Sequence, residues 1–116
     1  MDKIHRKKQF LNMIKNEVKI ATTTFSTEEK AIEYSKLLVG MKLVACAQIE
    51  GPIRSCYWWQ QTIQESVEWR VVMKYSDLNE EKIKSQTVDK HEYDSPQWVS
   101  WTATSTESYS EWINNQ

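Results

Sequence analysis

The sequence predicts an α+β domain in which strands and helices follow the order β-α-β-β-α-β, with a further helix at the C-terminus. Segments rich in β-branched and aromatic residues alternate with segments of helical periodicity, and a capping signature precedes each of the two main helices. This order is that of the ferredoxin-like (split β-α-β) fold, in which four antiparallel strands carry both helices on one face and leave the other face bare. A central extended segment is also unusually long, which predicts a hairpin that extends past its own core.

The first strand and helix are expected on either side of Ser26. Residues 18–25, Val-Lys-Ile-Ala-Thr-Thr-Thr-Phe, are rich in β-forming residues. Ser26 and Glu29 have the spacing of a capping box, so a helix is expected to begin there. Apolar residues recur at helical spacing as far as Met41, and Gly40 marks the end of the helix.

A long hairpin is expected next, with a first strand running from Leu43 to Trp59 and a return strand over residues 67–74. Because strands usually have about five or six residues, such a hairpin overshoots its own core. Exposed aromatic residues on it are an aggregation hazard unless a partner covers them. The sequence therefore predicts an oligomer with Tyr57 and Trp59 in its interface.

The second half of the chain repeats the pattern. Asp77 and Glu80 repeat the capping signature, which predicts a helix from Leu78 to about residue 89. A β-rich run over residues 97–103 is expected to be the fourth strand, and the final helix is expected to carry Trp112 at the interface. For the 6 tryptophans, packing in the core and in an interface is favoured over a ligand-stacking cage, because aromatic residues at strand spacing are ordinary packing material.

Composition and charge exclude several classes of function. A length of 116 residues suits one domain, and a formal net charge of -1 gives no basic footprint for nucleic acid. The chain has neither a signal-peptide pattern nor the roughly 18 to 20 consecutive apolar residues that span a bilayer, so a cytoplasmic protein is expected. With only 2 glycines a phosphate-binding loop is hard to build, and catalytic motifs are absent, so the protein is not expected to be an enzyme.

Residues 1–17 are expected to form a basic N-terminal extension ahead of a domain over residues 18–116. A basic amphipathic stretch can lie on a membrane surface or bind an acidic partner. A solvated extension is favoured, because chain termini are commonly poorly ordered. The apolar residues that could form a helical stripe in this extension are Ile4, Phe10, Leu11 and Ile14.

The two cysteines form neither a disulfide framework nor a zinc-ligand pattern, since both need several Cys or His residues at fixed spacing. Cys46 is flanked by alanines in an apolar run, and a buried thiol is favoured there over a soft Cu(I) ligand. Cys56, beside Tyr57, is expected to be less protected.

An ordered set of landmarks runs from Val18 to Ile113. Its members are Thr22-Thr23-Thr24, Leu43-Val44-Ala45-Cys46-Ala47, Ser55-x-Tyr57-x-Trp59, Ile63 with Glu68 and Lys74, His91-x-Tyr93-x-x-Pro96, and Tyr109-x-x-Trp112-Ile113. The ordered set resembles the CutA family of divalent-cation tolerance proteins. The resemblance implies ferredoxin-like subunits in a compact homotrimer similar to the PII signalling proteins, with the hairpins joining sheets between subunits. It also implies tolerance to or binding of divalent metals, Cu²⁺ above all.

The candidate metal ligand is His91, with Glu92 and Asp94 close to it in sequence. Neutral imidazole is a common ligand for copper and zinc. One histidine falls short of the about four ligands of a closed zinc site, so further ligands would come from elsewhere in the chain or from neighbouring subunits. The competing interpretation is a structural histidine that hydrogen-bonds to backbone at the end of the second helix.

Two other functions stay open. In one, the trimer is a PII-like sensor that binds a small molecule or anion between subunits and signals to a protein partner. Lys74, Tyr93 and the hairpin tips motivate this function as candidate ligand-binding groups. In the other, the trimer is a stable scaffold whose effect on metal tolerance is indirect.

The chain departs from the family pattern at identifiable positions. The family commonly reads His-Pro-Tyr-Glu-Val-Pro-Glu, whereas this chain reads His-Glu-Tyr-Asp-Ser-Pro-Gln over residues 91–97. A proline is thus replaced by Glu92, and the final carboxylate by the amide of Gln97, a weaker ligand for hard metals. Gln61 stands where a glycine is usual near the hairpin tip, which removes a residue that readily adopts positive φ.

Overall fold

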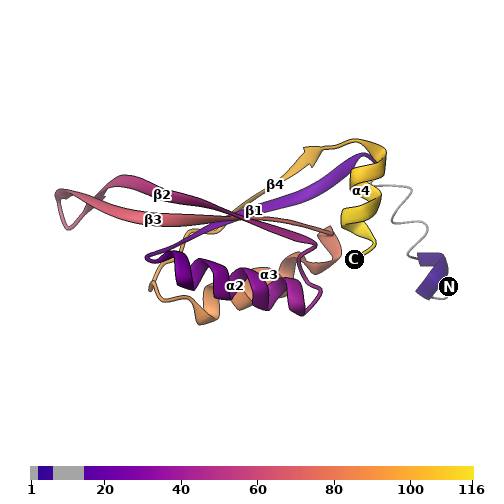
Figure 1. The fold of residues 1–116 in the computed structure, drawn as a ribbon, viewed down its shortest axis with the longest axis horizontal. Coiled ribbons are helices and arrows are strands. Elements are labelled where there is room, and N and C mark those ends of the chain that lie inside the picture. Colours follow the sequence, from indigo (N-terminus) through magenta and orange to yellow (C-terminus); the bar gives the residue numbers. More distant parts are fainter. Residues whose placement is uncertain (1–2, 7–14) are drawn as a thin grey trace.

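The computed structural model describes residues 3–6 and 15–116, and its elements follow the predicted order (Figure 1). The elements are β1 (Glu17–Phe25), α2 (Glu28–Gly40), β2 (Cys46–Trp59), β3 (Thr62–Tyr75), the 3-10 turn η1 (Asp77–Asn79), α3 (Glu80–Lys90), β4 (Val99–Thr104) and α4 (Glu107–Asn114). The α+β arrangement is therefore confirmed. Residues 3–6 are helical, whereas Phe10, Leu11 and Ile14 of the expected N-terminal stripe lie outside the described residues.

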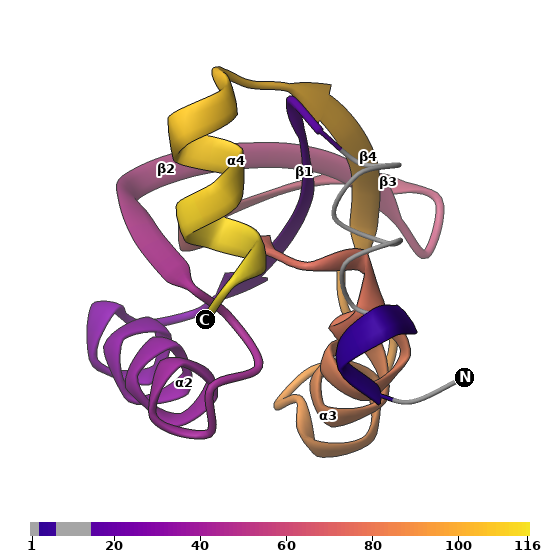
Figure 2. The same ribbon diagram turned by 90° about the vertical axis from the view of Figure 1, so that its right-hand side faces the viewer.

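The four strands form one antiparallel sheet in the order β2-β3-β1-β4. Figure 2 shows α2 and α3 side by side on one face of this sheet and α4 on the other. Alternate residues of a strand point to the same face, so one face of the sheet can be apolar throughout. The core between the sheet and the pair α2 and α3 includes the buried side chains of Ala21, Phe25, Leu38, Val71, Met73, Tyr75 and Ile83.

The start of α2 differs from the prediction by one residue. Thr27 is the N-cap, and its side chain accepts a hydrogen bond from the N–H of Lys30 at 3.1 Å. The expected cap at Ser26 was wrong because the Ser26 hydroxyl donates instead to Glu92, which lies 66 positions further along the chain. A tertiary contact has therefore replaced the local one.

The 3-10 turn η1 and the helix α4 also begin at capping side chains, whereas α3 has no side-chain cap. Ser76 accepts a hydrogen bond from the N–H of Leu78 and caps η1, so α3 itself starts at Glu80 rather than at residue 78. Thr106 caps α4 by accepting from the N–H of Tyr109. None of the helices in the described part of the chain is long and apolar enough to cross a membrane.

The overshooting hairpin is confirmed. β2 and β3 have 14 residues each and pair along their length with one register shift. Figure 1 shows their outer half extending beyond α2 and α3. The connection is made by Gln60 and Gln61, which both adopt positive φ, at 50° and 66°. A two-residue hairpin turn of this kind requires positive φ at both central residues. Here two glutamines adopt it instead of glycine.

One extra residue in β2 decides which way the outer hairpin faces. Glu50 pairs with Arg70, and Ile53 pairs with Glu68, so β2 advances three residues while β3 advances two. Opposing residues of an antiparallel pair share a face. Beyond the shift, odd-numbered residues of β2 therefore lie on the face that carries α4.

An aromatic surface is uncovered in the single chain. Tyr57 and Trp59 lie on the face that carries α4 and are 45% and 59% exposed, whereas Trp58 lies on the opposite face and is 71% exposed. The strand register places Val99 and Trp101 of β4 on the same face as Tyr57, and both are exposed. Tyr57 and Trp59 are the residues that the sequence predicts to lie in an oligomer interface.

Gly51 lies in the register shift, against the indole of Trp69. A Cβ atom at Gly51 would lie 2.3 Å from Cδ1 of Trp69, closer than any van der Waals contact allows. Trp69 packs against the core, and its Nε1 is buried with no hydrogen-bond partner among the described residues. At Gly40, the other glycine, a Cβ atom would meet nothing within 4 Å.

Gly51→Ala is expected to lower the free energy of unfolding by roughly 1–3 kcal/mol, the usual cost of overpacking, because the new methyl group displaces Trp69. Gly40→Ala is the matched control, since it adds the same methyl group to open space in a helix and should leave stability unchanged or raise it. Urea unfolding followed by circular dichroism measures both variants. Equal midpoints for the two would contradict the close packing of Gly51 on Trp69.

Candidate functional site

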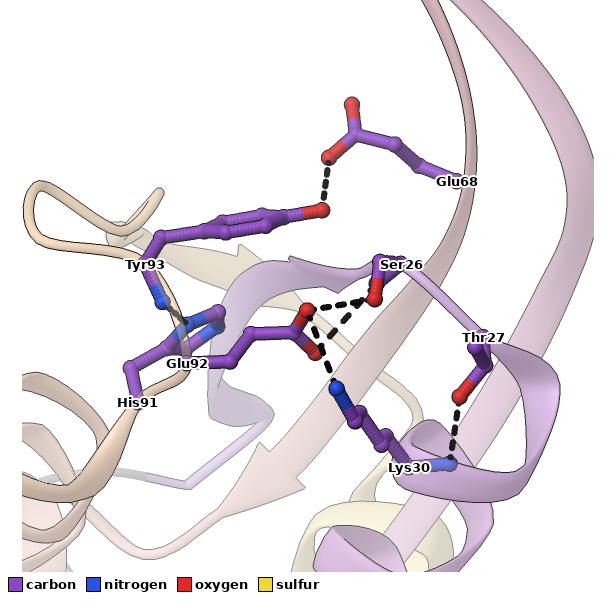
Figure 3. Close-up of polar contacts among 7 residues, drawn as sticks. All are labelled: Ser26, Thr27, Lys30, Glu68, His91, Glu92 and Tyr93. Atoms are coloured by element: carbon purple, nitrogen blue, oxygen red, sulfur yellow. Dashed lines mark hydrogen bonds and ion pairs between the residues drawn. The ribbon is translucent and has the colours of Figure 1, made fainter.

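The residues predicted to bind metal lie in the loop between α3 and β4. Figure 3 shows this loop beside the end of β1 and the start of α2. His91 follows α3 directly and has an extended backbone, with φ −74° and ψ 150°, which ends the helix. The side chains of Glu92 and Tyr93 then reach different elements of the fold.

His91 makes contacts on both sides of its ring. The ring stacks on Phe25 with centroids 4.5 Å apart and planes 9° apart. Nδ1 accepts a hydrogen bond from the backbone N–H of Tyr93 at 3.0 Å, and Nε2 lies 3.2 Å from Oγ1 of Thr23. Because a backbone N–H can only donate, Nδ1 is unprotonated, so the neutral ring carries its proton on Nε2 and donates it to Thr23.

Burial lowers the pKa of His91, and a hydrogen bond with the backbone of Thr24 and the nearby carboxylates of Glu92 and Glu68 only partly offset this effect. The ring is therefore neutral at pH 7, which is the form that binds metal ions. Both nitrogens are already engaged within the chain, however, so a metal ion has to displace Thr23 or Tyr93. These contacts agree with the structural interpretation of His91 that the sequence left open.

Glu92 is tied to the start of α2. Its carboxylate accepts hydrogen bonds from the hydroxyl of Ser26 and from the N–H of Ser26 at 3.4 Å, and it lies 3.5 Å from Nζ of Lys30. Burial raises the pKa of Glu92, but the hydrogen bonds from Ser26 and the charge of Lys30 outweigh burial and hold the pKa below its usual range. The carboxylate is therefore ionised and already has its partners at neutral pH.

Tyr93 forms a hydrogen bond to β3, whereas Asp94 faces solvent. The Tyr93 hydroxyl donates to Oε2 of Glu68 at 3.0 Å, and burial together with this carboxylate raises the pKa of Tyr93. Asp94 is exposed. Within residues 3–6 and 15–116, no group of three or more His, Cys, Asp or Glu side chains is arranged to hold a metal ion. His91, Glu92 and Asp94 are thus neighbours in sequence that the single chain does not gather around one point.

Lys74 lies on another part of the sheet. Its Nζ is 3.4 Å from the hydroxyl of Tyr109 and 5.4 Å from the centre of that ring, and Tyr109 stacks on Trp112 with centroids 5.9 Å apart. Glu68, the partner of Tyr93, is six residues away on β3, or roughly 20 Å along an extended strand. The two predicted ligand-binding residues, Lys74 and Tyr93, are therefore not brought together within one chain.

The structure adds residues that the sequence did not single out. Thr23, Phe25 and Lys30 contact the loop after α3, and local spacing gave no signal for these long-range contacts. A groove of about 340 Å³ between α2 and α3 adjoins them, and Lys30 and Glu92 are among its lining residues. Both cysteines lie on β2. Cys46 is half-buried rather than fully buried as expected, and Cys56 is exposed.

The lowered pKa of His91 predicts a pH-dependent stability. Protonation favours the unfolded state, so the free energy of unfolding should fall as the pH drops below about 6.5, the ordinary histidine pKa, and go on falling until the folded state is also protonated. His91→Gln should flatten this part of the curve. Denaturant unfolding between pH 7.5 and pH 5 tests this expectation, and identical curves for wild type and His91→Gln would contradict it.

Comparison with known proteins gives a consistent result. The family model described as CutA1 divalent ion tolerance protein matches residues 19–116. The divalent-cation tolerance protein CutA of Thermotoga maritima is 34% identical over 74 residues, which are 64% of this chain and 72% of the relative. The probable divalent-cation tolerance protein cutA homolog of Encephalitozoon cuniculi is 30% identical over 95 residues, or 81% of this chain and 82% of the relative.

Solved structures agree with the sequence relatives. The crystal structure of divalent ion tolerance protein CutA1 from Ehrlichia chaffeensis matches with a TM-score of 0.81 and 26% identity, covering 84% of this chain and 92% of that one. The divalent cation tolerance protein (Cut A1) from Thermus thermophilus matches with a TM-score of 0.79 and 27% identity, covering 84% and 96%. The chain therefore belongs to the CutA1 divalent ion tolerance protein family.

Proposed function

We propose that this protein is a cytoplasmic homotrimer without enzymatic activity that binds or responds to divalent metal ions, Cu²⁺ before others. The observation that carries the proposal is the family match over residues 19–116. The neutral imidazole of His91 supports it, because this group suits Cu²⁺ and other late divalent metals. A closed site needs more ligands than His91 and its neighbours supply, so the remaining ligands come from another subunit or from a rearranged loop.

Calorimetric titration of Cu²⁺ into the metal-free protein is expected to show saturable binding that His91→Ala weakens at least roughly tenfold, since even residues that only orient a metal ligand contribute that much. His5→Ala is the matched control, because the chain has 2 histidines and this variant removes the one outside the proposed site. Equal losses in the two variants, or the lack of any saturable binding, would exclude His91 as the principal ligand.

The trimer is proposed from the uncovered aromatic surface. Tyr57, Trp59 and Trp101 share the face of the sheet that carries α4, and within α4 Trp112 stacks on Tyr109. All four of these large aromatic side chains are at least 44% exposed in the single chain. Exposed apolar surface of this kind marks an interface, and a copy of the same chain is the partner that the family architecture implies.

Trp59→Glu is expected to convert the trimer to monomer or aggregate, because it buries a charge in the interface. Trp58→Glu is the control, since it places the same charge one residue away on the opposite face of the hairpin. Size-exclusion chromatography with light scattering measures the mass of both variants. A trimeric Trp59→Glu variant with an unchanged melting temperature would show that this face is not the interface.

One contact favours the second function, a PII-like sensor. Lys74 is held by Tyr109 and pairs with none of the described carboxylates, so its ammonium group is available to an anion. A ligand that binds only the native state raises the melting temperature by mass action. Thermal-shift measurements with metal ions and with nucleotides therefore separate the two functions. A response to metal ions alone would exclude the sensor.

A further inference from the structure

We infer that Glu92 is a positioning residue rather than a metal ligand, and that its carboxylate fastens the loop between α3 and β4 to the start of α2. The contact of Glu92 with Ser26 and Lys30 is called the loop latch below (Figure 3). By holding the loop, the latch keeps the ring of His91 stacked on Phe25. Only the effect of the latch on metal affinity rests on the proposed function; its effect on the loop concerns the protein without ligand.

The loop latch joins one carboxylate to donors from a distant part of the chain. Glu92 accepts from the hydroxyl and the N–H of Ser26, 66 positions earlier, and lies 3.5 Å from Nζ of Lys30. The Glu92 side chain is 19% exposed, although the residue as a whole is exposed, so water reaches part of the contact. Hydrogen bonds to an ionised acceptor are roughly twice as strong as neutral ones. The latch therefore adds two charge-assisted hydrogen bonds from Ser26 to an ion pair that would contribute little by itself at the surface.

The latch acts on His91 because the two residues are adjacent in the backbone. The contacts that His91 makes itself, with Thr23, Phe25 and the backbone of Tyr93, are all between neutral groups. Of residues 91–98, only Glu92 forms an ion pair with another described residue. Releasing Glu92 leaves the start of the loop held by these neutral contacts and by the hydrogen bond from Tyr93 to Glu68, so the His91 ring gains freedom to leave its place.

The same geometry argues against Glu92 as a metal ligand. A carboxylate ligand must direct a lone pair toward the metal ion, whereas the oxygens of Glu92 face Ser26 and Lys30. An ion at this carboxylate would also meet the ammonium group of Lys30, which repels a cation at so short a distance. Glu92 therefore acts through the position of His91 instead of through direct coordination.

Glu92→Gln tests the inference in the full-length, metal-free protein, because it keeps the shape of the side chain and removes its charge. The expected result is amide exchange about tenfold faster over residues 91–98, the loss that follows from removing a charge-assisted hydrogen bond. The ring nitrogen and proton resonances of His91 should shift as well. Native-state hydrogen exchange and histidine side-chain NMR measure the two effects.

Two further variants make the test specific. Lys30→Met removes the other half of the ion pair at a half-exposed position, and combined with Glu92→Gln it should add nothing to the single change. Glu33→Gln is the matched control, because it removes an equal charge one turn along α2 and Glu33 forms no ion pair among the described residues. If Glu33→Gln and Glu92→Gln had equal effects on the loop, the inference would be overturned.

Titration of Cu²⁺ alone into the same variants separates this inference from the proposed function. If wild type binds no Cu²⁺ but Glu92→Gln still moves the His91 resonances, the proposed function fails and the loop latch stands. If Glu92→Gln loses Cu²⁺ binding while the His91 resonances and loop exchange stay as in wild type, Glu92 is a ligand and the inference is overturned. If Glu92→Gln changes both the His91 ring resonances and the affinity for Cu²⁺, the result supports the proposed function and the loop latch.

Discussion

The extra residue that β2 carries between Glu50 and Ile53 is the constraint on which the outer half of this molecule depends. Side chains alternate between faces along a strand, so a shift of one residue exchanges the two faces for every position beyond it. Without the shift, Tyr57 and Trp59 would lie on the side of α2 and α3. Gly51 lies within the shift and leaves room for the indole of Trp69, which a Cβ atom there would meet. A packing contact inside the sheet thus decides which surface the hairpin presents to a partner.

Most of the fold was predictable from local patterns. Strand and helix periodicity, two capping signatures and the length of the central segment were enough for the element order and the overshooting hairpin. The cap of α2 was misplaced from Thr27 to Ser26 because the Ser26 hydroxyl binds Glu92, and no local rule registers a contact across 66 positions. Local sequence patterns also could not predict the register shift, because the packing of Gly51 on Trp69 within it is a contact between two strands.

The site was predictable only in part, for a related reason. Sequence reasoning identified His91 by its chemistry and recognised that a structural role competed with a metal-binding one. It had no means of finding Thr23, Phe25 or Lys30, which reach the loop after α3 from the first strand and helix. These contacts engage both ring nitrogens of His91. Any metal ion bound there must therefore offset the loss of hydrogen bonds that the fold already uses.

The separation of Lys74 from Tyr93 links function to assembly. Lys74 and Glu68, the partner of Tyr93, lie six residues apart on β3, roughly 20 Å along an extended strand, so one chain does not bring Lys74 and Tyr93 around one small ligand. The same holds for metal binding, because within the described residues of one chain no cluster of ligands surrounds His91. In both proposed functions, a second chain or a rearranged loop after α3 would supply the missing groups. The aromatic face set by the shift at Gly51 is the surface through which that second chain can be held, and so a change that removes the interface should also remove the ligand site.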